Sequence, residues 1–117
     1  MQNLPKHSEA YLKFIHLSQA LRSLPGLPVL DPIEERLLNA LASSWFTDKE
    51  ATVLETMHST PNMSPSTVHR RLKSLRKKGL INFNVDDEDN RVKYIVKTSI
   101  ADKYFTHLGQ CMTGALV

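Results

Sequence analysis

The chain has 117 residues, of which 41% are apolar and 23% carry a charge, which is the composition of one globular domain rather than of a disordered segment. Its formal charge is only +3, and its single cysteine, Cys111, excludes an intramolecular disulfide. The sequence has neither the Cys/His spacing of a zinc site nor an apolar run that would make a membrane span or a secretory signal. We therefore expect a cytoplasmic protein without metal or cofactor, whose fold depends on packing.

The first predicted helix covers residues 8–24, where apolar side chains recur at helical spacing and Ser8 is a candidate N-cap. The segment Pro25–Pro28 ends it, because proline lacks the amide donor and Gly26 suits the turn after a last helical residue. The apolar stripe is broader than one neighbouring helix needs, so we interpret residues 1–30 as a dimerisation element and linker, with packing within the chain as the open alternative. The dimerisation candidates in this helix are Tyr11, Phe14, Leu17 and Leu21.

Two further helix starts are predicted from capping patterns. Asp31 precedes a proline, and Glu34 stands where its side chain can reach back to the cap amide. The apolar face of the helix that follows consists of Ile33, Leu37, Leu38, Leu41, Ala42 and Trp45. Thr47 and Glu50 repeat the capping pattern and predict a shorter helix that ends near His58. The candidates for burial in this shorter helix are Ala51, Val53, Leu54 and Met57.

The next predicted helix begins at Ser64 and Pro65 and ends at Gly79. Its apolar side chains form one narrow stripe, which consists of Val68, Leu72 and Leu75. Residues 64–79 contain six basic residues and no acid, a charge of +6, so the rest of the chain sums to −3. The basic character of the protein therefore lies in this one helix.

After this helix the apolar period changes to two, which is typical of strands. The two alternating runs consist of Ile81, Phe83 and Val85 and of Val92, Tyr94 and Val96. Only Ile95 breaks the second alternation, and the charged turn 86–90 separates the runs. The pattern predicts an antiparallel hairpin that projects from the helices.

A last amphipathic helix is predicted over about 13 residues between Ile100 and Met112, with Ser99 and Asp102 as its capping signal. Its apolar face contributes two more dimerisation candidates, Leu108 and Met112. The predicted fold is thus mainly α with a small antiparallel β-hairpin.

The basic helix meets the two requirements of a helix that reads DNA, which are an apolar stripe toward its own protein and an outer face with hydrogen-bond donors. At 100° per residue, the side chains opposite the stripe are Ser66, Arg70, Lys73 and Lys77. The free amides at the N-terminus of the helix and the hydroxyl of Ser64 suit a phosphate. Arg70 and Arg71 lie about two turns in, where an arginine can meet guanine with two parallel hydrogen bonds.

The other basic side chains of this helix are expected to face phosphates or solvent, and they are Lys73, Arg76, Lys77 and Lys78. His69 could touch a phosphate, but an ordinary exposed helix position is the favoured explanation. The alternative to DNA binding for the whole helix is a solvated basic face on a module that binds protein. Six like charges without a compensating acid repel one another, which favours a polyanionic partner.

The residues from Pro32 to Leu108 resemble the winged helix-turn-helix domain of MarR-type bacterial transcription regulators. The most specific part is Ser64–Ile81, which is similar to the family's serine-x-serine-threonine-valine start and lysine-glycine-leucine-isoleucine finish, and Asp87–Arg91 resembles its wing tip. The resemblance implies a short helix, a recognition helix and a two-stranded wing. The DNA contacts that it implies are Ser64, Ser66, Thr67, Arg70 and Arg71, with Arg91 as the wing arginine.

Two features depart from this family. The wing tip carries one arginine and four acids, Asp86, Asp87, Glu88 and Asp89, which repel phosphates, so we do not count on this wing entering the minor groove. Arg91 can instead pair with Asp89 and stiffen the hairpin. Family members also usually have longer C-terminal dimerisation helices, so we expect the N-terminal helix to share that role.

We accordingly interpret residues 31–98 as a winged helix-turn-helix domain and residues 99–117 as a C-terminal helix for packing or dimerisation. The predicted function is sequence-specific binding of double-stranded DNA by a homodimer whose recognition helices lie about 34 to 36 Å apart. The predicted DNA contacts are Ser64, Ser66, Thr67, His69, Arg70, Arg71, Lys73, Lys77 and Arg91.

Catalysis is not expected, because the sequence shows no glycine-rich phosphate loop and no nucleophile elbow. The alternative function is a winged-helix module for protein interaction or assembly, as in a plasmid or phage replication or partition complex. A small-molecule effector would require a pocket between the dimer helices and the winged domain, which the sequence does not indicate.

Overall fold

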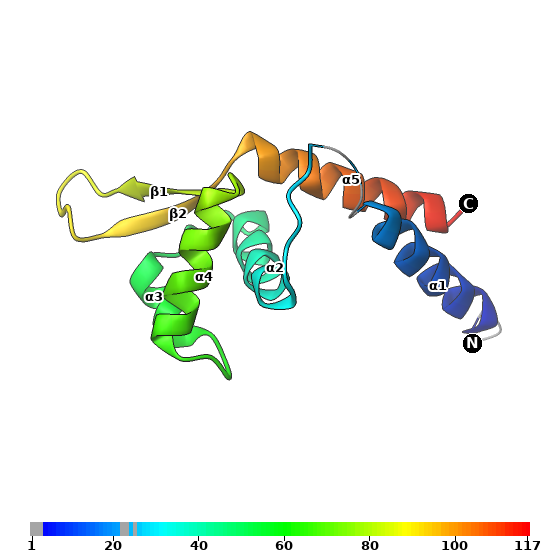
Figure 1. The fold of residues 1–117 in the computed structure, drawn as a ribbon, viewed down its shortest axis with the longest axis horizontal. Coiled ribbons are helices and arrows are strands. Elements are labelled where there is room, and N and C mark those ends of the chain that lie inside the picture. The colour runs from blue at the N-terminus through cyan, green and yellow to red at the C-terminus, as the bar shows by residue number, and fades with distance from the viewer. Residues whose placement is uncertain (1–3, 22–23, 25) are drawn as a thin grey trace. The chain divides into compact units, whose positions relative to one another are not determined.

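The structure, a computed structural model, describes residues 4–21, 24 and 26–117 (Figure 1). Its elements, in chain order, are α1 (Leu4–Leu21), α2 (Pro32–Phe46), α3 (Val53–Ser59), α4 (Pro65–Lys77), β1 (Ile81–Val85), β2 (Lys93–Lys97) and α5 (Ser99–Ala115). This order of four helices, a hairpin and a helix confirms the predicted fold class. None of these helices is long and apolar enough to cross a membrane.

The chain divides into two compact units. The central unit is Leu30–Ala101, and the terminal unit combines Met1–Val29 with Asp102–Val117. The central unit therefore contains α2, α3, α4 and the hairpin, while α1 and most of α5 belong to the terminal unit.

The starts of α2 and α4 follow the predicted capping. Asp31 Oδ1 accepts a hydrogen bond from the Glu34 amide at 2.8 Å, and Glu34 Oε1 accepts one from the Asp31 amide at 2.9 Å, which completes the capping box. Ser64 caps α4 by accepting from the Thr67 amide at 3.2 Å, and Pro65 occupies the first helical position. Local sequence therefore decides where these two helices begin.

The predicted start of α3 is wrong. The capping box is formed by Thr52 and Glu55, not by Thr47 and Glu50. Because α2 continues to Phe46, Thr47 serves as the C-cap of α2 and cannot open another helix. Asp48 follows at φ 57°, the left-handed conformation with which the chain leaves α2.

Two further predicted caps are corrected. α1 begins at Leu4, so Ser8 lies inside the helix; proline is favoured in a first helical turn, and Pro5 stands there. α1 ends at Leu21, and the predicted terminator Pro25 lies outside the described residues. α5 is capped by Thr98 rather than Ser99, because Thr98 Oγ1 accepts from the Ala101 amide at 3.2 Å.

The core of the central unit lies between α2, α4 and the start of the hairpin. Its fully or nearly fully buried apolar side chains are Leu30, Leu37, Leu38, Leu41, Val68, Leu72, Leu75, Leu80, Ile81, Ile95 and Ala101. The narrow stripe of α4 is thus buried as predicted. In α3 the predicted burial of Leu54 is wrong, since it is 65% exposed, and the buried side chain is Thr56.

The hairpin is antiparallel, pairs Phe83 with Ile95, and extends away from the helices of the central unit (Figure 1). Ile95, predicted to interrupt the alternation, is the fully buried residue of β2. Its amide donates to Ala51 O at 2.8 Å, and its carbonyl accepts from Trp45 Nε1 at 3.2 Å. These bonds attach the base of the wing to the last turn of α2 and to the segment that follows α2. Tertiary contacts therefore decide which face of β2 points inward.

Candidate nucleic-acid interface

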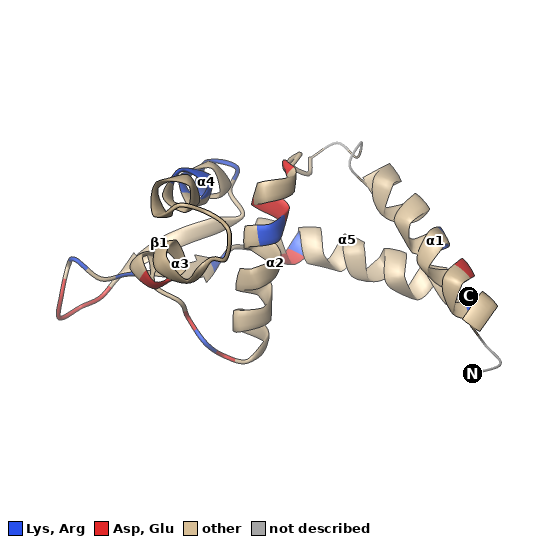
Figure 2. Ribbon diagram, turned by 90° about the horizontal axis from the view of Figure 1, so that it is seen from below, with Lys and Arg blue, Asp and Glu red and all other residues tan. Residues whose placement is uncertain are grey.

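Three basic residues project from the outer face of α4. Arg70, Lys73 and Lys77 lie within an arc of about 60° on the helix, opposite its buried stripe. All three side chains are exposed, and none takes part in an ion pair or hydrogen bond within the described part of the chain. Figure 2 shows Lys and Arg along α4. We call these three residues the outer set; their charges are fully available to a partner.

A second group, on α4 and at its C-cap, faces α2 instead; we call Arg71, Ser74 and Lys78 the inner set. Arg71 Nη1 donates to Asp31 Oδ2 at 2.6 Å. Ser74 Oγ donates to Glu34 Oε2, and Lys78 Nζ to Glu34 Oε1, both at 2.6 Å. The expectation that Lys78 faces phosphates or solvent is therefore wrong, and Arg71 points to α2 rather than to the outer face.

Glu34 is the acceptor at the centre of these contacts. Its side chain is only 1% exposed, and both carboxylate oxygens accept hydrogen bonds. Burial alone would raise the pKa of Glu34, but the hydrogen bonds from the Asp31 amide, Lys78 and Ser74 outweigh it, and the pKa lies below its ordinary value of 4.5. The carboxylate is therefore charged at neutral pH although it is buried.

Arg71 and Asp31 form a second, more open link between α4 and α2. Their side chains are 32% and 36% exposed. Arg71 Nε is buried without a hydrogen-bond partner, so only part of the guanidinium is satisfied. Because Nη1 is paired with Asp31 and Nε is buried, a two-nitrogen contact with a guanine would have to share Nη1 with Asp31.

The N-terminus of α4 holds the predicted serine and threonine residues. The hydroxyl of Ser64 accepts from the Thr67 amide and donates to Thr67 Oγ1 at 2.8 Å, so both side chains are engaged in the cap. Ser66 is exposed, with its hydroxyl 3.3 Å from that of Ser64. Its amide is among the first of the helix, where no intrahelical partner exists and the helix dipole favours an anion.

Two side chains flank the outer set. His69 is half-buried. The guanidinium of Arg76 lies over the ring of Phe83, 5.0 Å from its centre, in a cation–π contact between α4 and β1. Arg76 therefore links the helix to the wing.

The wing tip is closed by its own hydrogen bonds. Arg91 forms a two-pronged ion pair with Asp89, with Nε–Oδ1 at 3.0 Å and Nη2–Oδ2 at 3.1 Å, which lowers the pKa of Asp89. Asp86 Oδ2 accepts from the amides of Glu88 and Asp89, each at 3.1 Å. Figure 2 shows the acidic tip at the end of the hairpin. The pairing of Arg91 with Asp89 is the arrangement that the sequence offered as an alternative to minor-groove contact.

The predicted dimerisation residues lie in the terminal unit with different exposures. Tyr11 is 63% exposed and Met112 58%, whereas Leu21 is buried at 6%. Phe14, Leu17 and Leu108 are half-buried. Of this set, Tyr11 and Met112 are the most available to a second chain.

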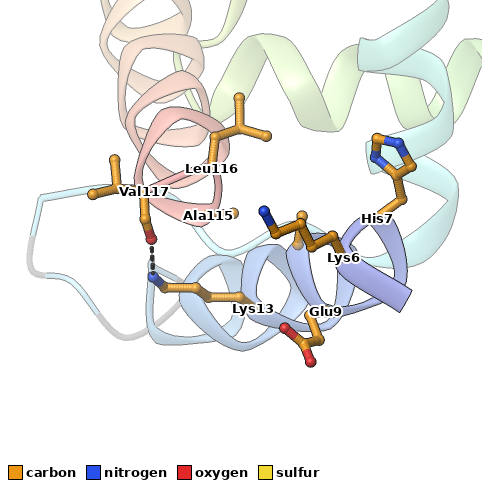
Figure 3. Close-up of a pocket in the computed structure, with 8 residues that line it drawn as sticks. Lys6, His7, Glu9, Lys13, Ala115, Leu116 and Val117 are labelled. Carbon is orange, nitrogen blue, oxygen red and sulfur yellow. Dashed lines mark hydrogen bonds between the residues drawn. The ribbon is translucent and has the colours of Figure 1, made fainter. Parts of the chain in front are cut away.

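Cavities occur in both units. In the terminal unit, one of about 490 Å³ is lined by Lys6, His7, Glu9, Ala10, Lys13 and residues 115–117 (Figure 3), and there Lys13 Nζ donates to Val117 O at 3.1 Å. A second, of about 340 Å³, is mostly apolar and is lined by Leu17, Ala20, Leu21, Leu24, His107, Gln110, Cys111 and Gly114. In the central unit a groove of about 460 Å³ lies beside Trp45. Among the described residues no three His, Cys, Asp or Glu side chains lie close enough to hold a metal.

The acidic partners of the inner set are the residues that the sequence does not reveal. Glu34 is explained locally by its role in the capping box, and nothing nearby in sequence points to Lys78, 44 residues away. The only available signal is that Arg71, Ser74 and Lys78 recur on one side of α4 beside the apolar stripe. That pattern is consistent with a half-buried row of polar side chains, but it does not indicate which helix packs against them.

No protein-family model and no curated protein matches the sequence, but the fold matches solved structures. Transcriptional regulator Tm0710 from Thermotoga maritima has a TM-score of 0.60 and 14% identity, over 90% of this chain and 66% of its own. The heme sensor protein PefR from Streptococcus agalactiae, in complex with heme, has a TM-score of 0.55 and 22% identity, over 97% of this chain and 71% of its own. A mutant of ZitR from Lactococcus lactis has a TM-score of 0.52 and 21% identity, over 95% of this chain and 79% of its own.

This chain therefore spans slightly less than two thirds of the Thermotoga protein. The TM-scores of 0.52 to 0.60 show a common fold, and identities of 14% to 22% are too low to show a common ligand. In that fold α3 and α4 form the helix-turn-helix, and β1 and β2 form the wing. The chain has the winged helix-turn-helix fold of MarR-type transcriptional regulators.

Proposed function

We propose that this protein is a regulator of transcription that binds double-stranded DNA with α4 in the major groove and catalyses no reaction. The observation that carries the proposal is the outer set, three exposed basic side chains on one face of a packed helix that have no partner among the described residues. A polyanion is the partner that relieves their mutual repulsion. The winged helix-turn-helix fold supports the major groove as the place of contact.

Each residue of this surface has a proposed role. Arg70 reads a guanine edge, because its guanidinium is exposed, has no partner among residues 4–21, 24 and 26–117, and can form two parallel hydrogen bonds. Lys73 and Lys77 bind phosphates, and the amide of Ser66 binds a further phosphate at the positive end of α4. His69 can add a contact beside them. We do not assign base reading to Arg71, which is paired with Asp31.

The wing makes a smaller contribution in this proposal. Arg91 is held by Asp89 among acidic neighbours, so the tip lacks a free cation for the minor groove. The hairpin instead supports α4 from the side through Phe83 and Arg76.

The proposal is tested by comparing two substitutions on the outer set. Arg70→Ala should weaken binding of the best duplex selected from a random pool by about 1 to 3 kcal/mol and leave random duplex less affected. Lys77→Ala should weaken both duplexes similarly and reduce the slope of log affinity against log salt by about 1, because one phosphate contact is lost. Fluorescence anisotropy with labelled duplexes measures both effects.

The matched control is Arg36→Ala, which removes an exposed arginine from α2 instead of α4 and should change neither affinity nor slope. Equal losses for Arg70→Ala on selected and random duplex would contradict base reading. Absence of any binding by the wild-type protein at micromolar concentration would reject the function and favour the protein-interaction module.

We further propose that the protein binds DNA as a homodimer through its terminal unit. Support comes from large apolar side chains exposed there, with Tyr11 63%, Leu12 64% and Met112 58% accessible. Tyr11→Glu should convert a dimer to a monomer in analytical ultracentrifugation, whereas Leu54→Glu, at a similarly exposed apolar position in α3, should not. A wild-type protein that sediments as a monomer would overturn this part.

A further inference from the structure

The inner and outer sets of α4 are adjacent in the sequence, residue by residue. Each outer residue, Arg70, Lys73 or Lys77, is followed directly by an inner one, Arg71, Ser74 or Lys78. Neighbours on an α-helix are 100° apart, so a bond that fixes an inner side chain also fixes the direction of its outer neighbour. The two faces are thus mechanically coupled.

The bonds to α2 restrain the two motions open to a packed helix. Arg71 and Lys78 are seven residues apart, about 10 Å along the axis, so two anchor points at that separation oppose both sliding and rotation. The apolar stripe of Val68, Leu72 and Leu75 is less directional, because apolar contacts are compatible with more than one orientation of a helix. The network of short, charge-assisted hydrogen bonds selects one.

Stability alone does not require a charged group at this position. A buried ion pair is often no more stabilising than an apolar pair of the same volume, since both charges lose their hydration. Glu34 nevertheless has three hydrogen-bond donors converging on it, two of them from α4. This arrangement suits a requirement for a defined helix orientation.

We propose that Glu34 is a positioning residue for DNA recognition, which sets the rotation and height of α4 on α2 and thereby the direction in which Arg70 meets a base. This inference rests on the proposed DNA-binding function. Glu34 itself is buried and touches no DNA. Its loss should therefore reduce discrimination between DNA sequences more than it reduces general affinity for DNA.

The test compares wild-type protein with Glu34→Gln, which keeps the side-chain size but removes the charge. On the duplex selected from a random pool, affinity should fall about tenfold. On random duplex it should stay the same or rise, because the protein loses one negative charge beside α4. Glu50→Gln, which removes the same charge from an exposed loop position, should leave the ratio of the two affinities unchanged. An equal fall on both duplexes, or no fall on either, would overturn the proposal.

A second measurement does not depend on DNA. In hydrogen exchange, the amides of residues 72–79 should exchange at least tenfold faster in Glu34→Gln than in the wild type, while those of α3 stay unchanged. If the wild-type protein binds no DNA, the proposed function fails by itself, and this measurement still decides whether Glu34 anchors α4. Unchanged exchange in residues 72–79 would refute the anchor.

The double variant Glu34→Gln/Lys78→Gln guards against loss of folding. Two amides can form a neutral hydrogen bond across the same pair of helices, so this variant should fold and regain part of the discrimination lost in Glu34→Gln. A double variant that folds but discriminates no better than Glu34→Gln would contradict the positioning role.

Discussion

The two faces of α4 carry basic residues of the same chemical kind, yet these residues have opposite environments. The outer set is exposed and has no partner in the part of the chain that the structure describes, whereas the inner set is bonded to the acidic side chains of Asp31 and Glu34. Of the six basic residues in this segment, Arg71 and Lys78 are neutralised within the protein. The comparison teaches that charge counted along a helix overestimates the charge that a partner can meet.

The largest expected effect is a difference in the free energy of unfolding between a substitution in the inner set and one in the outer set. Lys78→Met leaves Glu34 buried without its cation and should lower the free energy of unfolding by about 3 kcal/mol. Lys77→Met, one position away on the outer set, should change it by less than about 0.5 kcal/mol, because an exposed side chain has no partner to lose. Urea denaturation monitored by circular dichroism gives both values. Similar losses for the two variants would break the comparison.

The end of α4 offers a second prediction, since Gly79 follows directly after Lys78, the C-cap of the helix. Gly79 has φ 84°, and a Cβ built there would lie 2.8 Å from Ile100 Cδ1. Gly79→Ala should therefore destabilise the protein by about 1 to 3 kcal/mol. Gly109→Ala is the control, because Gly109 lies within α5 with no atom near an added Cβ, and it should stabilise by about 0.5 to 1 kcal/mol. Thermal unfolding that shifts in the same direction for both would refute this reading of Gly79.

A third prediction, of smaller effect, concerns how the free energy of unfolding depends on pH through Glu34, the acceptor of the inner set. The pKa of Glu34 is lower in the folded protein than its ordinary value of 4.5, so the stabilisation is present above that pH and is lost as the pH falls through the folded value. Glu34→Gln removes this titration, and its stability should decrease less steeply below pH 4.5 than that of the wild type. Denaturant titrations at a series of acid pH values provide the two slopes. Parallel slopes would show that Glu34 does not contribute.

The smallest effect is expected at the wing. Arg91→Ala removes an exposed side chain that is already paired with Asp89, so DNA affinity should change less than for Arg70→Ala. The same anisotropy assay measures it. A loss at Arg91 as large as that at Arg70 would show that the wing arginine leaves Asp89 to bind DNA.

Much of the fold follows from local patterns. The capping box at Asp31 and the Ser64–Pro65 start specify α2 and α4, and the change of apolar period after Gly79 specifies the hairpin. The same rule failed at Thr47, which has the residues of a cap but stands at the end of an existing helix. Capping is local, but which of two equivalent caps is used depends on where the preceding helix stops.

The candidate site was predicted less completely, and Arg71 shows why. Helical spacing places Arg71 between the apolar stripe and the outer face, so the sequence alone allows either environment. The partner that decides, Asp31, lies 40 residues earlier in the chain. Similarly, Ile95 interrupts the alternation of the second strand in the sequence. The hydrogen bonds of its backbone to Trp45 and Ala51 explain its place only in the folded protein.

The sequence by itself determined the helices, the hairpin and the concentration of basic residues in α4, because capping and apolar periodicity act over a few residues. Only the tertiary structure decided which of those basic residues remain free. Ion pairs between α2 and α4 join residues about 40 positions apart, and a burial such as that of Glu34 exists only after the helices have packed.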